Sequence, residues 1–238
     1  MLKLPIPIAT PARRRALAAL GAAALAMAGL PAQSLDSAPS EKDRALIQAA
    51  GRGDAAGVQR LLKEGASVQA AGADGVTALI AAAYRNRVEP ARLLIAAGAD
   101  VNRQDRTRQS AYLISTSDGY LELLRLTLTS GADVHSLDSY NGTGLIRAAD
   151  RGHAAIIAEL LKTPIKVDHV NRLGWTALLE AIILGDGGPR HTESVRLLVA
   201  AGADVNLADR DGVTPLAHAR RRGFKDMVAI LERAGARP

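Results

Sequence analysis

The histidines are the side chains of this 238-residue chain best suited to acid–base or metal chemistry, because imidazole titrates near neutral pH and ligates metals. A zinc-dependent hydrolase places two of them four residues apart on one helix face, as in the H-E-x-x-H motif. No such pair or motif occurs in the sequence. We therefore interpret all five as structural or surface residues: His135, His153, His169, His191 and His218.

Aspartates recur along the chain and could be mistaken for an acid cluster. Their spacing follows a fixed period, which indicates that each one closes a turn or caps a helix. The recurring positions are Asp74, Asp100, Asp105, Asp133, Asp138, Asp204 and Asp209. Ser110, Ser115 and Ser117 have no identifiable base, and no G-x-S-x-G elbow, phosphate-binding loop or dinucleotide fingerprint occurs. We predict that the protein is not an enzyme and binds no cofactor and no metal.

The composition predicts a core of closely packed helices. Apolar residues make up 48% of the chain but aromatic residues only 3%, so the core must be built from Ala, Leu, Val and Ile. Such a core suits packed helices better than a sheet sandwich. The chain has no cysteine, which excludes disulfides, thiolate metal sites and a cysteine nucleophile.

The net charge of +6 could suggest nucleic-acid binding, but much of it lies at the N-terminus. The segment 1–32 contains Lys3, Arg13, Arg14 and Arg15 and no acidic residue. Without these four cations the balance is 26 basic to 24 acidic residues, a net charge of +2. The composition therefore gives little support for a nucleic-acid partner, and we predict none.

The N-terminal segment, 1–32, has the arrangement of a secretory signal peptide. Three arginines, residues 13–15, precede an uncharged, Ala-rich stretch at 16–30, and Ala32 follows as a small residue at a cleavage point. The run is too short and too weakly apolar for a good membrane span, although an uncleaved anchor or a disordered tail would have similar features. The sequence RRALA at 14–18 also resembles a twin-arginine export signal. We predict a periplasmic or secreted protein with a linker at 33–40, which meets the membrane only if the signal stays attached.

A glycine-containing motif recurs along the chain at a constant interval. The sequence GADVN occurs at 98–102 and 202–206, and a variant, GADVH, at 131–135. The interval from Gly65 to Gly98 is repeated from Gly98 to Gly131 and again from Gly202 to Gly235. Such a period indicates one supersecondary unit that is stacked several times. We place six units at 41–70, 71–103, 104–136, 137–169, 170–207 and 208–238, and number them one to six.

Each unit reads as a helix, a tight turn and an antiparallel helix. In unit one, apolar residues at 45, 46, 49 and 50, and again at 58, 61 and 62, follow the helical period on either side of a Gly-rich turn. In unit two, Asp74-Gly75 predicts a tight turn, and Thr77 stands where a helix N-cap is expected. The chain is therefore expected to be all-α, with glycine ending the second helix of each unit.

The units resemble ankyrin repeats. Residues 211–219, DGVTPLAHA, look like the T-P-L-H-x-A signature of that family, and Gly152-His153 and the LLxxGADVN pattern are also similar to it. The resemblance covers residues 41–238 and implies a solenoid in which each unit has a β-turn finger, an inner helix and an outer helix. It also implies that His153 bonds to backbone at a turn, and that the protein is a non-catalytic scaffold for another protein.

Three departures from the family pattern predict local differences. Arg108 stands where the family has glycine, at a cost of about 1 kcal/mol, so that finger is expected to be reshaped, whereas Asn141 is tolerable in the same slot. Pro164 replaces the terminal glycine of unit four, so the outer helix is expected to stop early. Unit five is five residues longer than the period, with the excess at 185–192. The glycines there predict a mobile loop, either a neutral insertion or a partner contact.

The resemblance also implies where a partner binds. In ankyrin proteins the fingers and the exposed side of the inner helices line a concave face, and Trp, Tyr and Arg dominate interface energies. Trp175 either packs on the neighbouring finger or anchors a partner. The candidate positions are Tyr84, Arg85, Arg106, Thr107, Tyr140, Asp150, Arg151, Arg172, Trp175, Arg210 and Asp211.

Three functions remain open at this point. The first is an exported scaffold that binds a protein in the periplasm. The second is a secreted effector that binds proteins of a host cell. The third is an enzyme, or the regulatory subunit of a periplasmic enzyme. Neither the identity of the partner nor the pathway follows from these residues.

Overall fold

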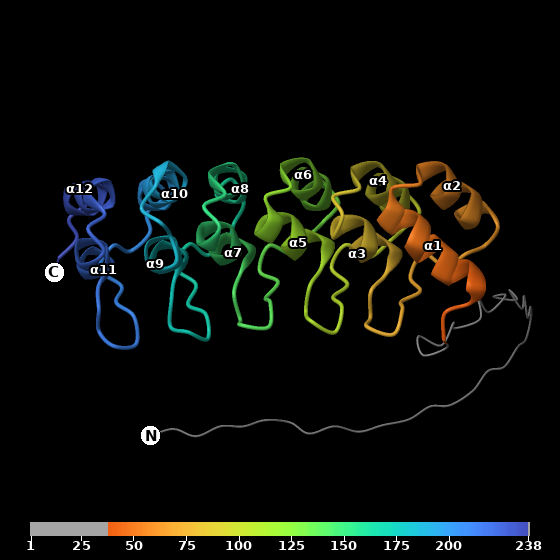
Figure 1. Ribbon diagram of the computed structural model, residues 1–238, viewed down its shortest axis with the longest axis horizontal. Helices are drawn as coiled ribbons and strands as arrows, with labels where there is room; N and C mark the ends of the chain where they lie inside the picture. The colour runs from red at the N-terminus through yellow and green to blue at the C-terminus, as the bar shows by residue number, and fades with distance from the viewer. Residues whose placement is uncertain (1–37, 238) are drawn as a thin grey trace, which may run out of the picture. The chain divides into compact units, whose positions relative to one another are not determined.

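The computed structural model describes residues 38–237, and these form a stack of helix pairs (Figure 1). The predicted signal segment, 1–32, and most of the predicted linker lie outside the described residues. The six inner helices, which lie next to the fingers, are α1 (Glu41–Arg52), α3 (Ala78–Ala83), α5 (Ala111–Asp118), α7 (Gly144–Asp150), α9 (Ala177–Ile183) and α11 (Pro215–Arg221). The six outer helices are α2 (Ala55–Lys63), α4 (Val88–Ala96), α6 (Leu121–Thr129), α8 (Ala154–Leu160), α10 (Pro189–Ala200) and α12 (Lys225–Arg233).

Helices are the regular elements of the described residues, apart from one isolated β-bridge between Ala71 and Thr77. Each inner helix packs on its own outer helix and on the inner helices of the adjacent units. A loop, the finger, precedes each inner helix from α3 onward, and Figure 1 shows these fingers in a row along one edge of the stack. The predicted all-α solenoid of about six units is confirmed. No helix within 38–237 has the length and apolar character that a membrane crossing requires.

The inner helices begin at capping hydroxyls that recur with the period. The side chains of these residues each accept a hydrogen bond from the N–H three positions on, which satisfies a helix-end donor that has no partner within the helix. The predicted cap at Thr77 is confirmed, and Ser110 keeps the role although it replaces threonine. From unit two onward the five capping residues are Thr77, Ser110, Thr143, Thr176 and Thr214, and Ser40 caps α1 in the same way.

Glycine ends the outer helices as the repeated motif predicts. Gly98, Gly131 and Gly202 have φ values of 89°, 86° and 86°, a left-handed conformation in which a Cβ would be strained. The motif is therefore a chain-reversal signal, and its recurrence carries little information about the partner.

The core consists mainly of Leu, Ile, Val and Ala side chains packed between the two rows of helices. Leu79, Leu94, Leu124, Leu145 and Ile157 are among the fully buried side chains. The buried residues form two clusters, one in units one to three and one in units three to six. Burial of this kind contributes about 1.5–3 kcal/mol for each large side chain.

Arg108 does not reshape its finger, and that expectation is wrong. Arg108 adopts φ 62°, as Asn141 does in the next unit. The finger closes with a hydrogen bond from Asp105 N to Gln109 O at 2.9 Å, which matches the bond from Asp138 N to Gly142 O at 3.0 Å. The finger is thus held in the common form despite the local strain.

The outer helix of unit four stops early, as Pro164 predicts. Helix α8 ends at Leu160, whereas α2, α4 and α6 each have nine residues, two more than α8. The inner helices of units two to five still start at a constant interval, at positions 78, 111, 144 and 177, so the early stop does not disturb the period.

Only the first half of the predicted loop at 185–192 is a loop, because residues 189–192 form the first turn of α10. Helix α10 begins at Pro189 and has 12 residues, three more than α4 or α6. Gly188 is its N-cap, and Pro189 occupies the first helical position, where its missing N–H leaves no bond unmade. The prediction of a loop overlooked this start signal. His191, in the first turn, is buried and hydrogen-bonded rather than exposed.

Candidate partner-binding surface

In units three to six a polar residue at the start of the finger closes its turn, whereas unit two has Gly72 at this position. In unit four, Oδ1 of Asp138 accepts hydrogen bonds from the N–H groups of Tyr140 and Gly142, each at 2.8 Å. The equivalent oxygen does the same in the fingers of units three, five and six, from Asp105, Asn171 and Asp209. The recurring aspartates at these positions therefore close turns, as predicted.

The other polar atom of the same side chain faces the inner helix of its unit. In units four, five and six it meets a residue nine positions further along the chain. The pairs are Asp138 with Arg147, Asn171 with Glu180, and Asp209 with His218, at 3.5, 2.7 and 2.7 Å. In unit three the inner-helix residue is Ile114, and Asp105 Oδ2 instead accepts from the Tyr84 hydroxyl at 2.7 Å. Units four to six thus each join their finger to their inner helix with side chains of their own.

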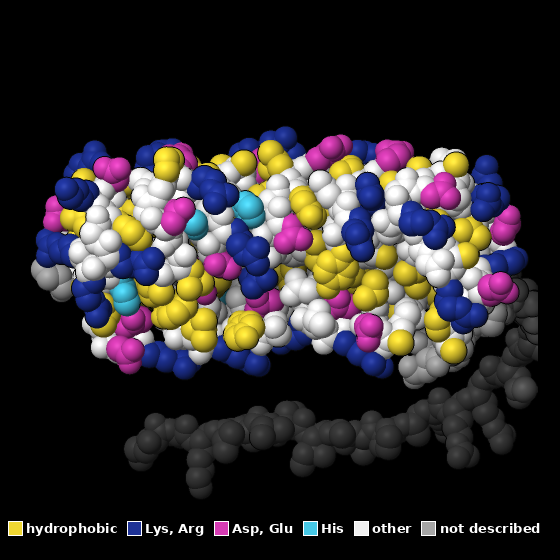
Figure 2. Space-filling model, viewed as in Figure 1, with side chains coloured by type: hydrophobic (Ala, Val, Ile, Leu, Met, Phe, Trp, Pro, Cys, Tyr) yellow, Lys and Arg dark blue, Asp and Glu magenta, His cyan; other side chains and the backbone are white. Residues whose placement is uncertain are grey.

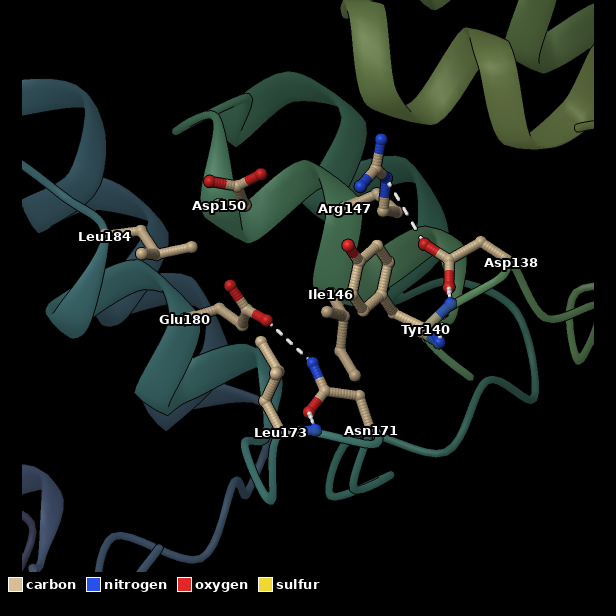
Figure 3. A pocket seen from close by; sticks show the side chains of 10 residues that line it. Asp138, Tyr140, Ile146, Arg147, Asp150, Asn171, Leu173, Glu180 and Leu184 are labelled. Atoms are coloured by element: carbon tan, nitrogen blue, oxygen red, sulfur yellow. Dashed lines mark hydrogen bonds and ion pairs between the residues drawn. The ribbon is translucent and has the colours of Figure 1, made fainter. Parts of the chain in front are cut away.

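A hollow opens between units four and five on this face (Figure 3). It encloses about 140 Å³, below the ~300 Å³ at which cofactor and drug-sized sites begin. Figure 3 shows the carboxylates of Asp150 and Glu180 on one side, and the Tyr140 ring with the Arg147–Asp138 pair on the other. The lining residues are Asp138, Tyr140, Gly142, Ile146, Arg147, Asp150, Asn171, Leu173, Glu180 and Leu184.

Glu180 is the buried acid of the hollow, with 4% of its surface exposed. Burial first, and then the charge of Asp150, raise the pKa of this carboxyl to about 7, while the hydrogen bond from Asn171 opposes the shift. Its Oε1 accepts from Asn171, and its Oε2 has no hydrogen-bond or ion-pair partner among residues 38–237. No fully buried side-chain oxygen or nitrogen of these residues lacks a partner, so solvent reaches Oε2 through the hollow.

The one cation that lines the hollow is already engaged. Arg147 Nε lies 3.5 Å from Asp138 Oδ2, and its NH2 group donates to Ser117 Oγ at 3.0 Å. Asp150 pairs with the exposed side chain of Arg151 at 3.4 Å, outside the lining. Among the described residues, no charged group therefore pairs with Glu180.

Apolar side chains form the rim of the hollow. Tyr140, Leu173 and Leu184 are 59%, 44% and 49% exposed, which is unusual for large apolar residues on a small stack. Figure 2 shows hydrophobic side chains gathered on this face, over α9 and its finger. The exposed apolar surface thus surrounds a polar, partly acidic floor.

Two of the predicted contact residues lie in the hollow, Tyr140 and Asp150. Leu173 follows Arg172 on the finger of unit five. Arg172 itself ties two fingers together, because its N–H donates to Tyr140 O at 2.9 Å and its side chain to Ser139 O at 3.0 Å. Trp175 is half-buried and does not line the hollow, so its role as an anchor stays a prediction.

The other predicted contact residues are spread along the stack. Tyr84 and Arg85 line a separate groove on units one and two, together with Arg52 and Arg87. The remaining five are exposed but line neither depression: Arg106, Thr107, Arg151, Arg210 and Asp211.

Sequence reasoning missed Glu180, Arg147 and Asn171. One signal was available for Glu180, since it is the only charged residue in the helical sequence ALLEAII, residues 177–183. Asn171 was visible as a departure from aspartate at the same finger position in three other units. What the sequence does not show is that these two residues meet.

Four of the five histidines make hydrogen bonds within the stack through their rings: His153, His169, His191 and His218. His153 Nε2 lies 3.1 Å from Ser117 O, which confirms the predicted backbone contact. His191 Nε2 lies 3.0 Å from Asp150 O, the equivalent carbonyl of the next inner helix, although the sequences around the two histidines differ. Within residues 38–237, no three acidic or histidine side chains are grouped as metal ligands.

Comparisons with known proteins agree with this architecture. A family model described as ankyrin repeats (3 copies) matches residues 18–105, 112–209 and 166–238, the first range beginning inside the predicted signal segment. The chain is 48% identical over 83 residues to the ankyrin repeat protein YahD of Escherichia coli K12, and 36% identical over 72 residues to mouse protein phosphatase 1 regulatory subunit 27. These matches cover 34% and 30% of this chain but only 41% and 44% of those two proteins.

Solved structures match over more of the chain. A crystal structure of an ankyrin repeat domain from Acinetobacter baumannii AYE is 46% identical, with a TM-score of 0.78, and covers 81% of this chain and 98% of that domain. The ankyrin repeat protein EF0377 is 32% identical, with a TM-score of 0.77, over 82% of this chain and 99% of that protein. Ankyrin repeats generally mediate protein–protein interaction. The chain belongs to the ankyrin repeat family.

Proposed function

We propose that this chain is a non-catalytic scaffold that binds a protein partner through the fingers and inner helices, with the hollow between units four and five at the centre of the contact. The observation that supports this most is the exposed apolar rim of Tyr140, Leu173 and Leu184 around that hollow. Interfaces concentrate their binding energy in such aromatic and apolar anchors, close to the centre of the contact.

The side chains of this rim are free to bind because the fold does not use them. Tyr140 contributes its backbone N–H and carbonyl to the finger, while its ring remains 59% exposed. Leu184 is the C-cap residue of α9 and is 49% exposed. A partner that covers these side chains gains hydrophobic free energy without any rearrangement of the stack.

A photo-crosslinking experiment tests this function. A photoreactive amino acid is placed at Tyr140 of the full chain in its native cell, and crosslinked proteins are identified by mass spectrometry. The matched control carries the same group at Arg196, which is exposed on the outer helix α10. We expect one protein that crosslinks from position 140 and not from 196. Crosslinks from 196 alone, or equal crosslinks from both positions, would contradict the proposal.

We also propose that the chain acts after export, in the periplasm or outside the cell. The support comes from the sequence, where the arginines at 13–15 precede an uncharged stretch at 16–30. The N-terminal sequence of the protein purified from cell fractions tests this. A mature chain that begins at residue 33 in the periplasmic or secreted fraction is the expected result, and an intact Met1 in the cytoplasmic fraction contradicts it. Accumulation outside the cell, rather than in the periplasm, distinguishes an effector of host proteins from a periplasmic scaffold.

A further inference from the structure

We propose that the hollow between units four and five receives an arginine side chain of the partner protein, with Glu180 and Asp150 as the carboxylates that hold it. This inference rests on the proposed function and names the partner's chemistry at its centre.

The size of the hollow selects a single side chain. Its 140 Å³ is too small for a cofactor, and the exposed lining residues Tyr140, Leu173 and Leu184 leave it open to solvent. A side chain that enters here projects from a partner lying across the two fingers. The walls are mostly apolar, from Ile146, Leu173 and Leu184, and suit the aliphatic stem of a long residue.

The charge of the hollow selects a cation. The charge of Arg147 favours the ionised Glu180, but by less than Asp150 opposes it, and Arg147 is paired with Asp138. Asp150 is paired only with the exposed Arg151, so Glu180 has no ion-pair partner among the described residues. An apolar occupant would cover Glu180 Oε2 and leave this oxygen without a hydrogen bond, which is unfavourable for a buried polar atom. A cationic occupant supplies both a donor and a charge for it.

The planar groups in the hollow favour arginine over lysine. The exposed Tyr140 ring forms one side, and a guanidinium stacks on such a ring more readily than an ammonium does. The N–H groups of one guanidinium can also donate hydrogen bonds to both carboxylates, Glu180 and Asp150, which lie together on the other side of the hollow.

Binding of the cation couples to the protonation of Glu180. The groups that face it are Asp150 and Arg147 of α7, Asp138 and Tyr140 of the neighbouring finger, and Asn171 of its own finger. Helices α10 and α11, which pack on α9, carry His191 and His218. Each of these histidines is hydrogen-bonded to an aspartate, Asp186 and Asp209 respectively. Arginine favours the ionised Glu180, so its affinity should rise with pH between 6 and 8, by up to about tenfold per unit in the range where the acid is protonated.

Binding of a short peptide to the ¹⁵N-labelled full chain tests the inference by NMR. The probe is acetyl-Gly-Gly-Arg-Gly-Gly-amide, and its control carries citrulline, which has the same shape without the charge. We expect the arginine peptide to shift the backbone amide of Leu173 and the side-chain amide of Asn171, with a Kd in the millimolar range and about tenfold tighter than for citrulline. A lysine peptide should bind several-fold more weakly than the arginine peptide.

Two variants with the same net charge separate the site from general electrostatics. Glu180→Gln should weaken the arginine peptide about tenfold and remove the pH dependence, because glutamine keeps the bond from Asn171 but carries no charge. Glu193→Gln, on the exposed outer helix α10 of the same unit, should leave both unchanged.

Several results would overturn the inference. These are equal binding of the citrulline peptide, an affinity of the unaltered chain that does not change with pH, shifts that lie away from units four and five, or no shift at roughly 20 mM peptide. The pH titration uses the unaltered chain, so the test holds even if a variant folds poorly. A protein partner that crosslinks from position 140 while arginine fails to bind would remove this inference and leave the scaffold function standing. Arginine binding without any crosslinked partner would contradict the scaffold function and leave only an arginine-binding hollow.

Discussion

The Nδ2 amide of Asn171 donates a 2.7 Å hydrogen bond to Oε1 of Glu180, nine residues further along the chain. In the adjacent unit the same two positions hold Asp138 and Arg147, an ion pair at 3.5 Å. Asparagine therefore stands at the start of the finger in the unit whose inner helix has an acid, where an aspartate would repel it. The two positions vary together within this one chain, which indicates that the finger and the inner helix are held to each other by complementary side chains.

Asn171→Asp should destabilise the protein by about 2 kcal/mol at pH 8, because it removes a buried donor and places a second carboxylate beside Glu180. The loss should be smaller at pH 6, where Glu180 is protonated. Urea unfolding at the two pH values measures both effects.

The double variant Asn171→Asp with Glu180→Arg recreates the pair of unit four, and it should recover most of the lost stability. A double variant no more stable than Asn171→Asp alone would show that the two positions are not coupled.

The burial of Glu180 makes stability depend on pH. Its pKa is about 7 in the folded chain against 4.5 as the ordinary value, so the folded state binds the proton more tightly. The tighter binding of this proton adds up to about 3 kcal/mol to the free energy of unfolding. This stabilisation is present in full below about pH 4.5 and is lost as the pH rises through 7. Glu180→Gln should lack this decline between pH 5 and 8. Parallel urea midpoints for the two proteins measure it, and identical pH profiles would contradict the raised pKa.

His191 should hold the extended helix of unit five in place. Its ring is buried and bonded to Asp150 O at 3.0 Å, so His191→Ala should cost about 1–2 kcal/mol. It should also speed hydrogen exchange in the first turn of α10. His153→Ala is the matched variant, because that ring makes the equivalent bond to Ser117 O. Faster exchange confined to units other than four and five would count against this role.

The sequence predicted the stacked helix pairs because the signals for them are local and repeated. The capping hydroxyl at Thr77, the chain-reversing glycine at Gly98 and the helical spacing of the core residues each act within a few positions. Such signals recur in every unit, so a unit in which one signal is missing still folds in the common form because its other signals remain. Arg108 is an example, since its finger keeps the common form set by Asp105.

The hollow could be predicted only in part, because it depends on contacts between units. Tyr140 and Asp150 were recognised from their positions on the finger and the inner helix. Glu180 was not, because its environment comes from residues of the preceding unit and from Asn171. The insertion of unit five was predicted to be a mobile loop because of its glycines, although Pro189 is a residue that favours the start of a helix.

The affinity of the crosslinked partner for the Tyr140→Ala chain tests the central claim most directly. The Tyr140 ring is exposed and unused by the fold, so the substitution should leave the melting temperature unchanged. Isothermal titration should show a loss of about 2 kcal/mol, a roughly thirtyfold increase in Kd, with Arg196→Ala on the exposed face of the outer helix α10 as the control. A Kd that is the same for Tyr140→Ala as for the unaltered chain would contradict the account, because the partner would then bind elsewhere on the stack.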